Sequence, residues 1–341
     1  MFEYFCICKT NLINLESKTY KRKPFVDNAK THFVTDSRYL LHDTGFGHPE
    51  NPKRYIVIVE ALKNLQLLGF ENRPIKPRQA KDDEILLCHT SDYYKLVQNE
   101  VEKYPMLSTG DAVICPASFE VAILASGAVL EGVDAVMQAK AKNVFCLVRP
   151  PGHHACSNRG MGFCIFNNVA IGARYVQRKY GIERVLIVDW DVHHGNGTQE
   201  IFEEDPSVFY FSTHQEGIYP GTGFAKERGT GLGEGSKLNC PIIAGMSSRI
   251  EVIKAFQEKL VPAMEEFQPE FVFISAGFDA HELDPLGRFN LTDQDFAELT
   301  YIVKRIADRY SEGRIVSVLE GGYNLKALAS AAVAHVTALA Q

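Results

Sequence analysis

Residues 185–196, VLIVDWDVHHGN, join a short apolar run directly to a cluster of polar side chains. Four apolar residues without alternation are typical of a strand that is buried on both faces of a parallel sheet. Because side chains alternate along a strand, Asp189, Asp191 and His193 are predicted to project to the same side. Two carboxylates and an imidazole that leave a buried strand together need a counter-charge, which a divalent metal ion provides. For this motif alone, a salt-bridged cluster or a helix cap is the alternative.

The rest of the chain repeats the pattern of buried strand and helix. Further apolar runs lie at residues 144–148, 208–211, 271–274 and 315–319. Helix-like segments lie at residues 119–137, 250–267 and 294–310. This alternation predicts an α/β fold with a mostly parallel sheet and helices on both faces. Since no repeat or low-complexity linker interrupts the pattern, we expect one domain at residues 33–341, preceded by an N-terminal arm at residues 1–32.

Composition excludes several classes of function. The net charge of −6 would repel a phosphate backbone, so we expect no direct binding of nucleic acid. No apolar stretch reaches the roughly 20 residues that a membrane span needs, and the N-terminus does not resemble a signal peptide. No C-x-x-C pair is present, so a structural zinc ribbon is not expected. We therefore expect a cytoplasmic protein, with delivery into a host cell as an open alternative if the source is an intracellular bacterium.

Polar clusters follow four of the predicted strands at the point where each strand ends. They are RPPGHHA at residues 149–155, DWDVHHGNG at 189–197, SAGFDAH at 275–281 and EGGY at 320–323. In doubly wound sheets, ligands bind beyond the carboxyl ends of the strands, so these four segments should converge. Asp279 then joins Asp191 and His193 as a third metal ligand and leaves a position for water, as in catalytic metal sites. The ligand types suit Zn²⁺, but also Fe²⁺ or Mn²⁺.

Metal-activated hydrolysis also needs a base for the water and an acid for the leaving amine. His153 and His154, side by side on a proline-stiffened turn, can divide that work, with Asp189 and Asn196 as partners that fix each ring. The Tyr323 hydroxyl could donate to the oxyanion that forms on an attacked carbonyl. Taken singly, a histidine pair is often structural, and a tyrosine at a strand end often belongs to the core.

These segments, together with GFCIFNN at residues 162–168 and YPGTG at 219–223, resemble the histone deacetylase and acetylpolyamine amidohydrolase family in order and spacing. The likeness runs from about residue 33 to the C-terminus and is nearest to the class II and bacterial-type enzymes. The resemblance implies a single α/β domain with an eight-stranded, mostly parallel sheet, as in arginases. It also implies that Asp191, His193 and Asp279 hold one zinc ion.

The resemblance implies roles for other residues as well. His154 would be the general base and acid, His153 its electrostatic companion paired with Asp189, Asn196 the partner of His154, and Tyr323 the donor to the carbonyl. The residues implied for substrate and ions are Gly162, Phe163 and Tyr219 in an acyl-lysine tunnel, Asp111 on its rim, Arg54 by the cavity where acetate departs, and Ser212 and Thr213 with nearby backbone carbonyls at a potassium site.

Leu286 bears on the choice of substrate. Polyamine-selective relatives can place an acid near this position to meet a distal ammonium group, and a leucine cannot do so. We therefore expect acetyl-lysine in a peptide or protein as the substrate, with an acetylpolyamine as the alternative. A catalytically silent module that binds acyl-lysine or docks on chromatin is disfavoured, because every expected ligand and the tyrosine are present.

Overall fold

Seven parallel strands form the centre of the computed structural model, which describes residues 31–66 and 74–341. Their order across the sheet is β1-β2-β7-β6-β3-β4-β5, and every neighbouring pair is parallel. The strands are β1 Thr31–Val34, β2 Asn143–Cys146, β3 Val185–Asp189, β4 Val208–Gln215, β5 Lys237–Ile242, β6 Phe271–Ala276 and β7 Ile315–Leu319. All five runs predicted as strands are strands, with ends that differ by a few residues. The predicted arm falls almost wholly outside the described residues.

The expected eighth strand is absent from the described part of the chain. At the β1 edge, the only further pairing in that part is a single parallel bridge between Val34 and Ile75. The Ile75 amide donates to the Phe33 carbonyl at 2.7 Å, and no second bridge follows. One bridge is too short to count as a strand, so the sheet has seven strands where the resemblance implied eight.

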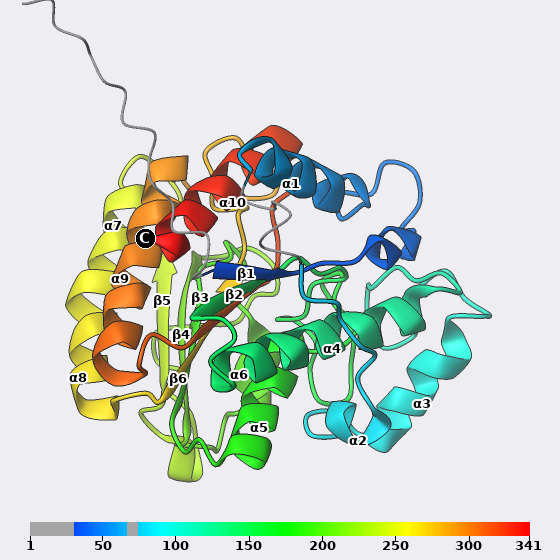
Figure 1. Ribbon diagram of the computed structural model, residues 1–341, viewed down its shortest axis with the longest axis horizontal. Helices are drawn as coiled ribbons and strands as arrows, with labels where there is room; N and C mark the ends of the chain where they lie inside the picture. The colour runs from blue at the N-terminus through cyan, green and yellow to red at the C-terminus, as the bar shows by residue number, and fades with distance from the viewer. Residues whose placement is uncertain (1–30, 67–73) are drawn as a thin grey trace, which may run out of the picture.

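Helices cover both faces of this sheet, as predicted (Figure 1). On one face, α4 packs against α5 and against strands β1, β2 and β7, and α5 also contacts α6. On the other face, α10 packs between α1 and α9, while α7 and α8 pack on α9. The helices are α1 Lys53–Asn64, α2 Asp82–Ile85, α3 Ser91–Glu100, α4 Ser118–Met137, α5 Asn168–Tyr180, α6 Asn196–Ile201, α7 Ser248–Lys254, α8 Val261–Phe267, α9 Asp293–Tyr310 and α10 Leu325–Ala340, with short turns η1 Ser37–Leu41 and η2 Gly231–Gly233.

The helix predicted at residues 250–267 is interrupted. A π-helical stretch, η3 Ala255–Leu260, separates α7 from α8. Pro262 lies at the start of α8 and has no amide hydrogen for the preceding turn, which favours a locally wider helix. The helix predicted at 294–310 is α9, and Thr292 is its N-cap as expected, with both its amide and its hydroxyl donating to Oδ2 of Asp295.

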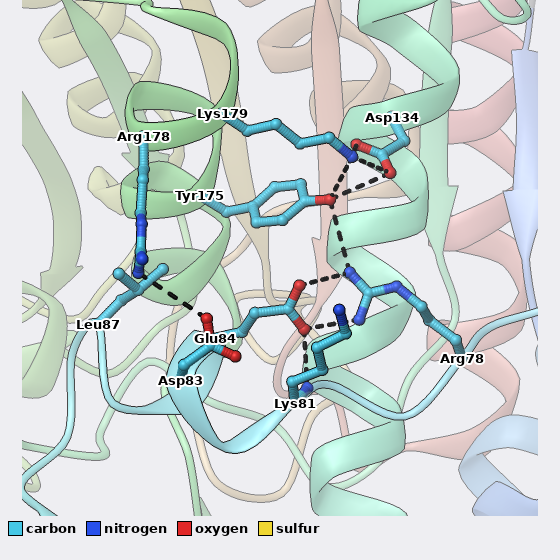
Figure 2. A pocket seen from close by; sticks show the side chains of 9 residues that line it. All are labelled: Arg78, Lys81, Asp83, Glu84, Leu87, Asp134, Tyr175, Arg178 and Lys179. Carbon is cyan, nitrogen blue, oxygen red and sulfur yellow. Dashed lines mark hydrogen bonds and ion pairs between the residues drawn. The ribbon is translucent and has the colours of Figure 1, made fainter.

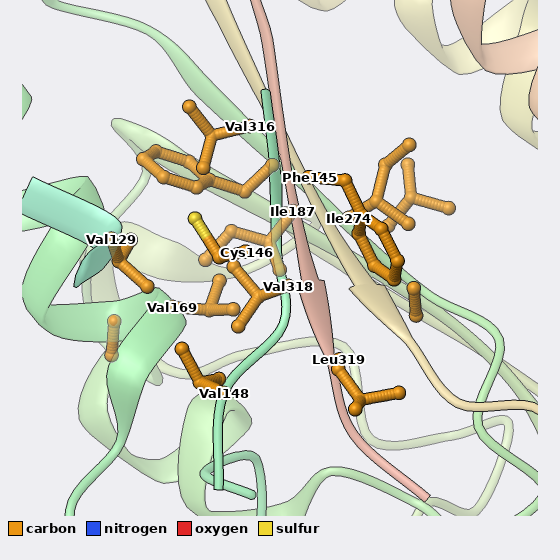
Figure 3. Close-up of a cluster of buried hydrophobic side chains, with 14 of the residues drawn as sticks. Val129, Phe145, Cys146, Val148, Val169, Ile187, Ile274, Val316, Val318 and Leu319 are labelled. Carbon is orange, nitrogen blue, oxygen red and sulfur yellow. The ribbon is translucent and has the colours of Figure 1, made fainter. Parts of the chain in front are cut away.

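The strands are buried on both sides, which explains their uniform apolarity (Figure 3). Val129 of α4 and Val169 of α5 lie against one face of the sheet, near Cys146 and Val318. All four side chains are fully buried. The polar segments predicted to converge therefore begin at the carboxyl ends of buried strands, β2, β3, β6 and β7.

No helix in the described ranges is long and apolar enough to cross a membrane.

Candidate active site

Three side chains from two of these strand ends meet at one point. The Nδ1 atom of His193 lies 3.1 Å from Oδ1 of Asp191 and 3.1 Å from Oδ2 of Asp279. Their ligand atoms all lie within 4.8 Å of one another, and both carboxylates are fully buried. Asp191 and His193 follow β3 and Asp279 follows β6, which are adjacent in the sheet. The convergence that the sequence predicted is present.

The three residues fit a metal ion. One oxygen of each carboxylate is fixed from behind, because Gly321 N donates to Asp191 Oδ2 and Val192 N donates to Asp279 Oδ1, both at 2.8 Å. The other oxygen of each carboxylate faces His193. A β-carbon at Gly321 would collide with both carboxylates, so only glycine leaves this space open. Two oxygens and one imidazole nitrogen thus form an open, three-residue set.

The electrostatics of the set favour a cation. Burial, together with the neighbouring Asp191 carboxylate, raises the pKa of Asp279 to about 7. Burial alone would lower the pKa of His193, but its hydrogen bonds to Asp191 and Asp279 outweigh burial and raise the pKa to about 10. Without a metal ion, a proton on His193 therefore supplies the positive charge that the two carboxylates require.

His153 is held by a buried carboxylate. Its Nδ1 lies 3.0 Å from Oδ2 of Asp189, and the hydroxyl of Tyr210 donates to the same oxygen at 3.0 Å. Burial opposes the charged form of His153, but Asp191 and Asp189 outweigh it and raise the pKa to about 10. These carboxylates favour the protonated form of His153, and its ring lies 4.0 Å from that of His154 between centroids.

His154 differs sharply from its neighbour. Its Nδ1 lies 2.8 Å from Oδ1 of Asn196, which begins α6. Burial and the charges of His153 and His193 hold the pKa of His154 well below its usual range. A neutral imidazole beside an imidazolium is poised to accept a proton rather than to carry one.

A cavity of 330 Å³ leads to these groups from outside. Its lining residues are Asp111, His154, Gly162, Phe163, His193, Ile218, Tyr219, Leu286 and Tyr323. The Tyr219 ring stands perpendicular to the His154 ring at 5.1 Å between centroids, and Phe163 contacts Tyr323 at 5.9 Å. Gly162 has φ +57° and a β-carbon there would strike the His154 ring. Except for Ile218, the sequence had singled out every lining residue.

Asp111 lies at the exposed side of the cavity. Its Oδ1 accepts hydrogen bonds from Gly162 N at 2.7 Å and from the Tyr219 hydroxyl at 3.3 Å. Oδ2 has no partner among the residues that the structure describes. One oxygen therefore fixes the cavity wall, and the other is left as an acceptor on an exposed residue.

Comparisons with known proteins agree with this geometry. The model of the histone deacetylase domain matches residues 48–339. The chain is 40% identical over 301 residues to a chloroplastic histone deacetylase 10 of Oryza sativa subsp. japonica, covering 83% of this chain and 67% of that protein. The chain belongs to the histone deacetylase family. The protein is accordingly a hydrolase that cleaves amide bonds.

Two further deacetylases illustrate the range of the family. The crystal structure of the HDA15 HD domain superposes on this deacetylase with a TM-score of 0.86 at 38% identity, covering 92% of this chain and 90% of that chain. The human polyamine deacetylase HDAC10 is 39% identical over 313 residues, which is 88% of this chain and 46% of the human protein. Membership of the family alone thus leaves the class of acetylated substrate open.

Arg54 of this deacetylase lies behind the cavity rather than in its lining. The guanidinium group is fully buried, 5.1 Å from the centre of the Tyr323 ring. Its Nε donates to the Gly322 carbonyl at 2.6 Å, and its Nη2 donates to the Glu320 carbonyl. Arg54 therefore holds the backbone that carries Tyr323. Ser212 and Thr213 lie on β4, where Ser212 pairs in register with Asp189 of β3.

Two acids that position the site were not among the predicted residues. The Glu320 carboxylate accepts from Gly152 N at 2.7 Å and from His153 N at 3.2 Å, so it fixes the turn that carries both histidines. The Asp284 carboxylate accepts from Tyr323 N at 2.6 Å. Glu320 lies inside the quoted segment EGGY, and Asp284 lies two residues before Leu286. Neither was predicted, because an acid that binds backbone amides is not marked by any spacing in the sequence.

A larger hollow, of 540 Å³, shares no lining residue with the active-site cavity (Figure 2). It lies beside α2, α4 and α5. Arg78 binds Glu84 through both terminal nitrogens, Lys179 binds Asp134, and Tyr175 donates to the same aspartate. These charges neutralise one another. The residues around the hollow therefore connect the three helices and do not form a second site.

Glu50 should matter for stability more than any surface acid. Its fully buried carboxylate binds Arg149 at 2.5 and 2.7 Å and Arg54 at 3.0 Å. Glu50→Gln would leave two buried guanidinium groups without a charged partner, so we expect a loss of about 3–5 kcal/mol in the free energy of unfolding. Urea unfolding at pH 7 measures it, with the exposed Glu60→Gln as control. A loss below about 1 kcal/mol, no more than that of surface substitutions, would contradict this account.

The buried carboxylate of Glu50 should also make the stability of the protein depend on pH. Burial would raise the pKa of Glu50, but Arg149 and Arg54 outweigh it and lower the pKa to about 2. A depressed pKa in the folded state contributes stability that is complete above the unfolded value of about 4.5 and is lost as the pH falls towards 2.

Proposed function

We propose that this protein is a zinc-dependent deacetylase that hydrolyses the amide of N-acetyl-lysine in peptides or proteins. The observation that carries the proposal is the set of Asp191, His193 and Asp279, with His154 and Tyr323 beside it in one cavity. The alternative substrate is an acetylpolyamine, which the similarity to a human polyamine deacetylase favours.

Zinc is the proposed ion, and Asp191, His193 and Asp279 would hold it. A mixed set of oxygen and nitrogen ligands from three residues is typical of catalytic zinc sites. When bound there, Zn²⁺ supplies Lewis acidity, which lowers the pKa of a water molecule and polarises a carbonyl group. The remaining chemistry belongs to the side chains around it.

His154 is the proposed general base and acid. Its pKa is lowered by burial and by the charge of His153, so the ring is neutral and able to take a proton from the attacking water. The same proton then passes to the leaving amine nitrogen. His153 keeps its positive charge throughout and stabilises the negative charge that develops on the substrate, because Asp189 binds its other nitrogen.

Tyr323 is the proposed donor to the oxyanion. Burial and the carboxylates of Asp279 and Asp191 raise the pKa of its hydroxyl well above the usual value, so the proton stays available for donation. Phe163 and Tyr219 form apolar walls that exclude water from an acyl-lysine side chain, and the free oxygen of Asp111 would accept an N–H group of the substrate.

A potassium ion near Ser212 and Thr213 stays a prediction. Both lie on β4 beside the start of the metal-binding segment. If backbone carbonyls there hold a monovalent cation, activity should depend on the potassium concentration and should be lost when a larger organic cation replaces it.

Leu286 tests the choice between peptide and polyamine. The side chain lines the cavity and is 39% exposed at its mouth. We expect Leu286→Glu to raise kcat/KM for acetylspermidine relative to an acetyl-lysine peptide by on the order of fivefold, since an exposed ion pair contributes about 1 kcal/mol at most. Leu286→Gln, of the same size but uncharged, is the control. An equal change in both variants would exclude the role of charge.

The function as a whole is tested by a substrate panel. Zinc-loaded protein is assayed on acetyl-lysine peptides, longer acyl-lysines, acetylspermidine and acetylputrescine, with a chelator in parallel wells. We expect the highest kcat/KM on acetyl-lysine peptides and no turnover with chelator. Preference for acetylspermidine would select the alternative, and turnover that survives the chelator would refute the metal-dependent mechanism.

A further inference from the structure

The side-chain amide of Asn196 faces two different surroundings. Its Oδ1 lies 2.8 Å from Nδ1 of His154. Because an amide oxygen can only accept, Nδ1 of His154 must carry the proton in this arrangement. The lone pair of the imidazole is then on Nε2, the nitrogen that remains for a proton from water. The role proposed for His154 as a base therefore depends on which way the Asn196 amide points.

An asparagine does not fix that direction by itself. Rotating the amide by half a turn exchanges its oxygen and nitrogen with almost no change of shape. The NH₂ group would then face His154, Nδ1 would have to accept, and the proton would move to Nε2, where it blocks base catalysis. A carboxylate at this position would present an oxygen in either orientation. An asparagine needs other groups to select one.

Two sulfur atoms lie on the other side of the amide. Asn196 Nδ2 is 3.4 Å from Sγ of Cys156 and 3.5 Å from Sδ of Met161. A thioether has no proton and can only accept, so Met161 favours the NH₂ group over the oxygen. The Cys156 Sγ also lies 3.8 Å from the His154 carbonyl oxygen, which can accept the thiol proton and leave the lone pairs of the sulfur to the amide.

Contacts within the loop at residues 156–164 hold the two sulfur atoms in place. Cys156 pairs with Arg159, and Met161 pairs with Cys164, in two successive bridges. Arg159 Nη2 donates to Cys156 Sγ at 3.5 Å, which keeps a second donor on the sulfur. Burial raises the pKa of Cys156 to about 11, so the thiol remains protonated. Neither Cys156 nor Met161 lines the cavity, so neither is expected to touch the substrate.

We propose that Cys156 and Met161 are positioning residues, which select the orientation of the Asn196 amide and thereby the Nδ1-protonated tautomer of His154. This inference rests on the function proposed above for its effect on catalysis. The tautomer itself is a property of the resting protein and is measured without turnover.

The first test reads the tautomer directly. Protein labelled with ¹⁵N-histidine and loaded with zinc is compared by ¹⁵N–¹H correlation spectroscopy as wild type, as Met161→Lys and as the double variant Cys156→Ala/Met161→Leu, with His154→Gln to assign the signals. We expect His154 to be protonated at Nδ1 in the wild type. Lysine is unbranched like methionine, one atom longer, and its ammonium group can only donate, so Met161→Lys should attract the amide oxygen and move the proton to Nε2. The double variant should show a mixture.

The second test reads catalysis on the acetyl-lysine peptide. We expect Met161→Lys to lower kcat by on the order of tenfold or more with little change in KM, because the wrong tautomer removes base catalysis. Met161→Leu, without donor or acceptor, should lower kcat by only about twofold. In an Asn196→Asp background the side chain presents an oxygen to His154 in either orientation. Met161→Lys should then change kcat by less than about threefold.

Two results would overturn the proposal. One is a His154 signal that keeps its proton on Nδ1 in Met161→Lys and in the double variant. The other is an equal loss of kcat from Met161→Lys in the wild-type and Asn196→Asp backgrounds, which would show a general structural effect. Wild-type protein that cleaves no acylated amine would refute the proposed function instead, and would leave the tautomer measurement intact.

Discussion

Replacing Tyr323 by phenylalanine is expected to lower kcat by about a hundredfold or more and to leave the stability unchanged. One donor to a developing oxyanion contributes roughly 3–4 kcal/mol, and it acts only when that charge forms. The ring contacts with Phe163 and Arg54 do not involve the hydroxyl. Among the described residues the hydroxyl has no hydrogen-bond partner, so its removal leaves no buried group unsatisfied.

The measurement is steady-state kinetics on an acetyl-lysine peptide, with thermal unfolding of the same preparations. Tyr210→Phe is an instructive comparison, since the Tyr210 hydroxyl binds Asp189 in the interior and does not reach the cavity. It should cost stability as well as activity, because it leaves a buried carboxylate with one partner fewer. Unchanged turnover in Tyr323→Phe would remove this tyrosine from the mechanism.

Asp279→Asn is expected to abolish activity while leaving the metal-free protein at least as stable as the wild type. The carboxylates of Asp191 and Asp279 are buried together, and their repulsion contributes to the raised pKa of Asp279. An amide keeps the shape and can still accept from Val192 N, but it removes one of the two charges. Without the metal ion only the proton on His193 offsets the two buried carboxylates, so removal of one of these charges is not expected to destabilise the protein.

The decisive readout is the response of stability to zinc. Binding to the folded state stabilises the wild type by about 2.7 kcal/mol at a free ion concentration one hundred times the Kd. Asp279→Asn should show little of this increase and should retain no zinc after dialysis. An equal zinc-induced increase in both proteins would mean that Asp279 is not a ligand.

Much of the site could be predicted because its chemistry is local in sequence. Asp189, Asp191 and His193 follow one buried strand at alternating positions, and the structure shows that this strand ends at the site. Asp279 and Tyr323 follow β6 and β7, which lie on one side of β3 in the sheet. The rule that ligands gather at the carboxyl ends of parallel strands was therefore sufficient to bring them together.

The supporting residues could not be predicted in the same way. Glu320 binds backbone amides of a turn 168 residues away in sequence, and Glu50 binds Arg149 across 99 residues. Such contacts depend on how helices and loops pack over the sheet, and no pattern of residue spacing in the sequence predicts them. Arg54, which the resemblance places by the cavity where acetate departs, lies behind Tyr323 and binds two carbonyl groups and Glu50, contacts that the sequence did not predict. Within residues 31–66 and 74–341 no eighth strand forms, because pairing beyond β1 stops at a single bridge there.

We propose above that Asp191, His193 and Asp279 hold one zinc ion, and the position of that ion can be measured directly. Anomalous diffraction from crystals of the zinc-loaded protein, recorded on both sides of the zinc absorption edge, locates the ion without reference to activity. We expect one strong peak, within coordination distance of about 2.0–2.2 Å from one atom of each of the three residues. A peak elsewhere, or density at this point that does not change across the edge, would contradict the account.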